Sequence, residues 1–354
     1  MSETLPPVRL GKPDVGAEEL AAVAAVVETG MLTMGPKVAE FEAEIAKACG
    51  TAHAVAVSSG TAALHLAVIA LGLEPGDEVL VPAYTFPATA NVVALSGLRP
   101  VLVDVDPVTM NVDPTKIDVG PRTKAMLAVH LFGRPARVEA LPDLPLIEDA
   151  AGALGALHKG RPCGSLGITG CFSFHPRKTV TTGEGGAVTT DDDEVADVVR
   201  QWRHHGWRPP TATDMPSPGL NYRIPDILCA IGIPQMQRLP ELLAARTRIA
   251  AGYTERLRDL PVVLPEADAG DVHGWQAYVI QLDDRDRILA ALRAQGIEAQ
   301  IGTYALHRLG AYRDQGPFPG ASSVFDRALA LPFHTSLTES ELDRVTDAIR
   351  ALIN

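Results

Sequence analysis

Lys178 has the sequence surroundings that point most clearly to chemistry. It lies in the segment 170–190, GCFSFHPRKTVTTGEGGAVTT, in which strand-like residues precede it and the glycine-rich stretch 183–186 separates it from a second strand. No lysine follows Lys178, although arginines continue to Arg350. Because lysine can form a Schiff base and arginine cannot, this pattern favours amine chemistry. A structural ion pair is the alternative.

A second feature is a candidate anion site. Residues 52–57 form an apolar, strand-like run, which leads through Ser58-Ser59-Gly60-Thr61 into the helical residues 62–71. A strand, a small polar turn and a helix N-terminus together present free backbone N–H groups and the positive end of the helix dipole to an anion. An ordinary helix cap is the alternative.

A third feature is a carboxylate at a strand end. The expected strand 145–147 is followed by Glu148, Asp149 and the small residues 150–152. Ligands of open α/β sheets bind outside the carboxyl ends of the strands, and the small residues leave room beside Asp149. Asp149 is therefore the candidate, with a role as a cap of the next segment as the alternative.

These candidates must be positioned by alternating strands and helices. Expected helices include residues 17–29, with Asp14 as the cap, and 88–95; residues 82–86 are expected to form a loop that ends in Phe86. The alternation predicts an α/β fold with a mostly parallel sheet covered on both faces. Residues 1–240 are the expected large domain, and residues 241–354 the expected smaller α/β domain.

Composition excludes several classes of function. The 354 residues carry a net charge of −12 and contain no long basic run, which argues against nucleic acid and anionic membranes as partners. The four cysteines are scattered without CxxC or metal-ligand spacing, so no metal site is expected and the thiols are expected to be reduced. The first residues contain no apolar signal core, and a cytoplasmic protein is expected.

Together, the candidates match what pyridoxal 5′-phosphate (PLP) requires. The cofactor needs a lysine for the Schiff base, a carboxylate for the pyridine nitrogen, an aromatic side chain against the ring and a phosphate site. Lys178, Asp149, Phe86 and the Gly60-Thr61 helix start supply these groups.

At this point the sequence resembles the DegT/DnrJ/EryC1/StrS sugar aminotransferases, which are PLP enzymes of fold type I. The likeness covers almost the whole chain. The motifs that carry it are Gly35-Pro36, Phe41-Glu42, Ser59–Leu64, Gly76–Val79, Pro82–Phe86, Glu148–Ala151, Ser173–Lys178, Gly183–Gly186, Gly219–Arg223 and Ala328–Pro332. The resemblance implies a three-layer PLP-binding large domain with a mixed, mostly parallel sheet.

The resemblance also implies roles for single residues. Lys178 would form the internal aldimine and move the proton, and Asp149 would pair with the pyridine nitrogen. Ring and phosphate contacts would come from Phe86, Gly60, Thr61, Ser173 and, across a homodimer interface, Asn221. The residues expected to face the sugar nucleotide are His205, Arg223, Tyr304 and His307.

One position departs from the family pattern. After Asp-Ala-Ala the family usually has His or Gln, which contacts the phenolic oxygen of the cofactor, whereas this chain has Gly152. Another residue or a water must make that contact, or the electronics of the ring differ. The related 3-dehydrases replace the lysine with histidine, so the presence of Lys178 favours transamination.

The expected reaction moves an amino group from glutamate, or glutamine, through pyridoxamine 5′-phosphate to a nucleotide-diphosphate keto-deoxysugar. A 4-keto-6-deoxyhexose is the expected acceptor. The alternatives are a keto-cyclitol or 3-keto-sugar acceptor, a PLP-dependent dehydrase on the same fold, and a catalytically silent binding or regulatory protein.

Overall fold

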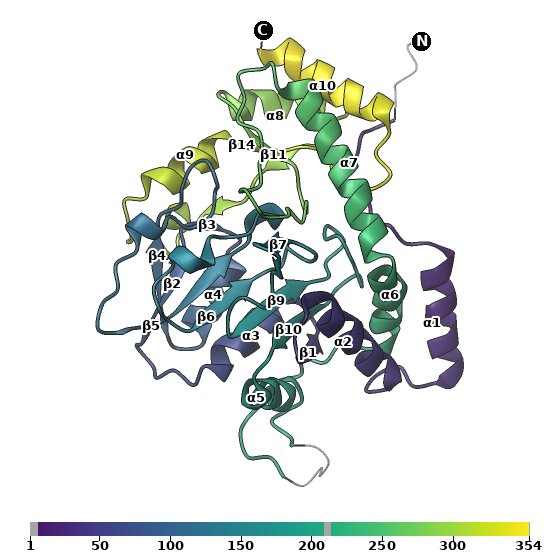
Figure 1. The fold of residues 1–354 in the computed structure, drawn as a ribbon, viewed down its shortest axis with the longest axis vertical. Helices are drawn as coiled ribbons and strands as arrows, with labels where there is room; N and C mark the ends of the chain where they lie inside the picture. The colour runs from purple at the N-terminus through teal and green to yellow at the C-terminus, as the bar shows by residue number, and fades with distance from the viewer. Residues whose placement is uncertain (1–5, 209–213, 354) are drawn as a thin grey trace.

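A seven-stranded sheet lies at the centre of the larger part of the computed structural model, which describes residues 6–208 and 214–353 (Figure 1). In spatial order its strands are β1 (His53–Val57), β10 (Gly186–Thr190), β9 (Thr169–Ser173), β6 (Leu146–Asp149), β5 (Thr123–Val129), β2 (Glu78–Pro82) and β4 (Arg99–Val103). Only β10 runs antiparallel to its neighbours in this sheet. The predicted mostly parallel, mixed sheet is confirmed.

Alternating side chains of the strands build a core on each face of the sheet. In β1, Val55 and Val57 join the cluster under one helix layer, whereas Ala54 and Ala56 join the cluster under the other. The first layer contains α3 (Gly60–Ala70), α4 (Ala88–Leu95) and α5 (Asp193–Arg203). The second contains α2 (Pro36–Cys49) and α6 (Asp226–Gln237), with α1 (Ala17–Thr29) packed outside α6 (Figure 1).

The C-terminal part forms a smaller α/β unit with its own core. The long helix α7 (Leu239–Leu257) leads into it from the large part (Figure 1). Its sheet has the order β11 (Val279–Gln281), β14 (Ala328–Ala330) and β12 (Gln300–Ile301), and its other helices are α8 (Arg285–Ala294), α9 (Pro319–Arg327) and α10 (Glu339–Ile353). The domain boundary after residue 240 stays a prediction.

Two short ladders lie outside the two larger sheets. β3 (Tyr84–Thr85) pairs with β13 (Tyr304–Ala305), and β7 (Leu157–His158) pairs with β8 (Arg161–Pro162). The expected loop at 82–86 is thus partly wrong, because residues distant in sequence supply the partner for β3. No helix in the described ranges is both long and apolar enough to cross a membrane.

The predicted cap of α1 is also wrong. Gly16 precedes the helix, and the Glu19 carboxylate accepts the N–H of Gly16 at 2.6 Å. Asp14 instead accepts from the hydroxyl of Thr335 at 2.6 Å and from Arg238 at 3.3 Å. The Asp14 side chain thus connects the N-terminal segment to Thr335 and Arg238, and a local sequence pattern does not reveal these distant partners.

Candidate active site

A cavity of about 520 Å³ contains most of the predicted site residues. It lies at the carboxyl ends of the sheet strands and extends to residues of the smaller unit, among them Gln276 and Thr303. The predicted residues that line it are Gly60, Thr61, Phe86, Asp149, Ser173 and Lys178. The structure therefore brings together the candidate lysine, carboxylate, aromatic residue and anion site, which are dispersed between residues 60 and 178 of the sequence.

Lys178 lies in the connection between β9 and the antiparallel β10. The N–H of Phe174 donates to the carbonyl of Gly185 at 2.9 Å, which closes the base of this connection. The buried Gln235 of α6 contacts the same connection: its side-chain oxygen accepts the Thr181 N–H, and its side-chain nitrogen donates to the Thr181 carbonyl. Hydrogen bonds thus fix the main chain before and after Lys178.

The local environment shifts the Lys178 amine toward its neutral form. Burial lowers the pKa of the Lys178 ammonium to about 8, although the nearby Asp149 carboxylate opposes the shift. A lysine with this pKa is partly deprotonated close to neutral pH, as a nucleophile or general base must be.

Asp149 ends β6 and is held by Thr89. The Thr89 hydroxyl, in the first turn of α4, donates to Asp149 Oδ2 at 2.7 Å, and Thr85 Oγ1 lies 3.2 Å from Thr89 Oγ1. All three side chains are buried. Burial raises the pKa of Asp149, whereas the Thr89 bond, the Ala151 N–H and the Lys178 charge lower it. Thr89 therefore orients the carboxylate and partly offsets the upward shift of its pKa, and Thr85 contacts Thr89 in turn.

The N-terminus of α3, where the sequence predicts an anion site, borders the cavity. Ser59 caps the helix: its Oγ accepts from the Ala62 N–H at 3.0 Å, and its carbonyl accepts from the Ala63 N–H. Gly60 and Thr61 line the cavity at the open end of the helix. A Cβ at Gly60 would lie 2.8 Å from Ser173 Cβ, so only glycine permits this close approach of α3 to the end of β9.

Phe86 lies on the cavity wall with 61% of its side chain exposed. Its ring is 6.3 Å from the ring of Tyr304 in an edge-on arrangement, because the pairing of β3 with β13 brings the two together. Of the four expected sugar-facing residues, Tyr304 is thus next to the cavity.

The other expected residues lie outside the cavity of the single chain. Asn221 and His205 are exposed, and Arg223 donates to His204 Nδ1 at 2.7 Å. His307 packs within the smaller unit, 2.9 Å from Ser322 Oγ and edge-on to Phe318. Their roles stay predictions.

A buried group with metal-ligating atoms, His130, Glu148 and Cys163, lies near the cavity. The Glu148 carboxylate accepts three backbone N–H groups, from residues 164, 166 and 167, and bonds His130 Nε2 at 2.8 Å. The other nitrogen of His130 accepts the Ala136 N–H at 2.9 Å. Since both residues use these atoms within the protein, we interpret the group as a structural hydrogen-bonded cluster.

Sequence reasoning missed three residues that position the site: Thr89, Gln235 and Arg246. The buried Arg246 of α7 donates to the carbonyls of Lys178 at 3.4 Å and Trp275 at 3.1 Å. Polar residues inside otherwise apolar helix faces were the available signal, but their partners are distant in sequence.

Comparison with known proteins gives consistent matches over the whole chain. The model of the DegT/DnrJ/EryC1/StrS aminotransferase family matches residues 13–350. A crystal structure of such an aminotransferase from Brucella abortus is 36% identical, with 95% of both chains covered and a TM-score of 0.91. DesI, solved in the presence of its TDP-sugar product, is 34% identical, with 99% of this chain and 93% of DesI covered and a TM-score of 0.92. Spr1654 from Streptococcus pneumoniae, a proposed sugar aminotransferase in its PLP form, is 26% identical, with 98% of both chains covered and a TM-score of 0.93.

We predict that Thr89→Val destabilises the protein, because it leaves a buried carboxylate without its hydroxyl donor. The expected loss in the free energy of unfolding is about 2 kcal/mol, measured by urea denaturation near pH 8. Thr89→Ser keeps the donor and serves as the control. A loss in Thr89→Ser as large as that in Thr89→Val would contradict the assignment of the effect to the hydrogen bond.

Proposed function

Because the chain belongs to the DegT/DnrJ/EryC1/StrS family of PLP-dependent sugar aminotransferases, we propose that it moves an amino group from glutamate to a nucleotide-diphosphate keto-deoxysugar. The observation that carries the proposal is the single cavity that unites Lys178, Asp149, Phe86 and the N-terminus of α3. Glutamine is the alternative donor.

The residues of this cavity fit PLP. Gly60 has no Cβ and therefore lies close to Ser173, at a helix N-terminus suited to a phosphate. Lys178 would carry the cofactor covalently, and Gly60, Thr61 and Ser173 would hold its phosphate. Asp149 would face the ring nitrogen and Phe86 a ring face. The PLP form of the similar Spr1654 supports this assignment.

Bound PLP supplies an electron-accepting ring and a carrier for the amino group between donor and acceptor. Asp149, held by Thr89, would keep a proton on the ring nitrogen. Lys178 would accept a proton from a substrate carbon at its Nζ and return it to a neighbouring carbon, which its lowered pKa permits. The apolar residues of the wall, such as Leu64 and Ala277, exclude water from these steps.

For the acceptor, we propose a 4-keto-6-deoxyhexose attached to a nucleoside diphosphate. The TDP-sugar product of DesI supports the nucleotide-sugar class. Tyr304, beside Phe86, is the residue of this chain best placed to contact the sugar. His205, Arg223 and His307 remain candidates for the nucleotide portion.

We also propose a homodimer in which Asn221 of the partner subunit completes the phosphate site. Asn221 is exposed and does not line the cavity of its own chain. Exposed apolar side chains on α1 and the segments on either side of it would suit an interface; they are Val15, Leu20, Val27, Met31, Leu32 and Met34.

The first prediction from this proposed function concerns the visible absorption of the protein after PLP is added. A band should appear, should bleach with excess glutamate and, after the glutamate is removed, should return when a nucleotide-diphosphate 4-keto-6-deoxyhexose is added. Mass spectrometry of the product gives the amination, and matched 3-keto and keto-cyclitol substrates test the alternatives. A band that glutamate and glutamine leave unchanged would contradict the proposed reaction.

The second prediction is that Lys178→Ala abolishes covalent attachment of PLP. Borohydride reduction should add the mass of reduced PLP to a wild-type peptide containing residue 178, and to no peptide of the variant. Lys124→Ala, at an exposed lysine whose ammonium bonds the Pro121 carbonyl, is the control. Labelling at another lysine in the wild type would refute the assignment.

The third prediction concerns the pH dependence of PLP incorporation. Only the neutral amine reacts, so the rate should fall about tenfold per pH unit well below pH 8 and level off above it. An ordinary lysine, with a pKa near 10.5, would give a rate still rising at pH 10. Stopped-flow measurement of the visible band between pH 6 and pH 10 distinguishes the two.

A further inference from the structure

Gly152 leaves a gap in the cavity wall that another side chain fills. A Cβ at Gly152 would lie 3.3 Å from Gln276 Cβ and 3.4 Å from Gln276 Cγ and Oε1. Both residues line the cavity. Gln276 thus occupies the space into which a side chain at position 152 would extend, although it comes from the segment before β11.

Several bonds fix Gln276 relative to Lys178. Its backbone N–H donates to the Phe132 carbonyl at 3.0 Å, and its carbonyl accepts from Arg246, which also bonds the Lys178 carbonyl. Its side-chain Nε2 donates to the carbonyl of Arg177 at 3.2 Å. The side chain is therefore held next to the main chain that carries the lysine.

The amide of Gln276 retains a donor for a ligand. A glutamine Nε2 carries two N–H groups, and the Arg177 carbonyl takes one of them. In PLP, the ring carbon that bears the aldehyde lies between the ring carbon with the phosphate arm and the ring carbon with a hydroxyl. With the phosphate at the contact of Gly60 and Ser173 and the aldehyde joined to Lys178, the hydroxyl would face a different part of the cavity wall. His130 cannot serve it, because both of its ring nitrogens are engaged.

Resting on the proposed function, we propose that the side-chain amide of Gln276 donates a hydrogen bond to the ring hydroxyl oxygen of PLP, in place of a side chain at position 152. A donor at this oxygen stabilises its deprotonated form. Gln276 therefore lowers the pH at which the bound cofactor changes protonation state, and so matches the site to neutral pH.

The test is a pH titration of the visible band of the PLP-loaded protein without substrate. Gln276→Met keeps the length of the side chain and removes the donor, so the midpoint should move upward by about one pH unit. Gln276→Glu replaces the donor with an acceptor and should move the midpoint in the same direction. An unchanged midpoint in these variants overturns the inference.

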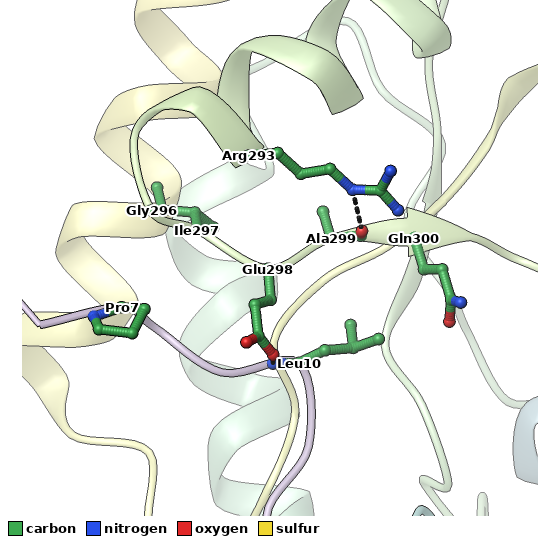
Figure 2. A pocket seen from close by; sticks show the side chains of 8 residues that line it. All are labelled: Pro7, Leu10, Arg293, Gly296, Ile297, Glu298, Ala299 and Gln300. Carbon is green, nitrogen blue, oxygen red and sulfur yellow. Dashed lines mark hydrogen bonds between the residues drawn. The ribbon is translucent and has the colours of Figure 1, made fainter.

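Gln300→Met is the matched control. Gln300 also contacts Arg177, whose guanidinium donates to Gln300 Oε1 at 2.7 Å. However, Gln300 borders a separate hollow of about 450 Å³ between the N-terminal segment and β12 (Figure 2). This variant should leave the midpoint unchanged, and an equal shift would show that displacement of Arg177 is the cause.

A side-chain exchange gives the second arm. Gln276→Ala should raise the midpoint, and Gly152→Gln added to it should restore the wild-type value. Gly152 is not among the glycines with a left-handed backbone, and Gln276→Ala removes two of the three atoms nearest to a Cβ at position 152, leaving the Cβ of residue 276 at 3.3 Å. Failure of the exchange to restore the midpoint counts against the inference. A wild-type protein without a visible band overturns the proposed function itself.

Discussion

The common direction of the sheet strands is the constraint on which the site depends. β10 is antiparallel to β1 and β9, so β1 and β9 run the same way as β6, β5, β2 and β4. Their carboxyl ends therefore meet at one edge. The start of α3 after β1, Asp149 at the end of β6 and the Lys178 connection after β9 are all brought to that edge by backbone pairing alone.

Burial at this edge has opposite effects on the two central charges. It lowers the pKa of Lys178 and raises that of Asp149, while the attraction between the two opposes both shifts. The outcome depends on hydrogen bonds to the carboxylate, which Thr89 and the Ala151 N–H supply. The same hydrogen bonds thus affect both the position and the pKa of the carboxylate.

The two parts of the chain share the construction of the cavity. The β3–β13 pairing and the bond from the Thr303 N–H to the Tyr84 hydroxyl, at 3.0 Å, connect them beside Phe86. Arg246 connects them again, since it bonds the carbonyls of Lys178 and Trp275. Residues of the smaller unit, such as Gln276 and Thr303, can therefore complete a wall that the sheet edge leaves open.

The alternation of strands and helices, the Lys178 connection, the strand-end Asp149 and the helix start at Gly60 can be predicted from the sequence, because each depends on residues adjacent in the chain.

The contacts that hold these groups form only in the folded chain: Thr89 bonds Asp149, Gln235 bonds Thr181, and Gln276 occupies the space beside Gly152. Tertiary structure also gave Asp14 a partner in Thr335 and made a strand of Tyr84–Thr85. These contacts join segments far apart in sequence, so packing of the whole chain, and not local periodicity, selects them.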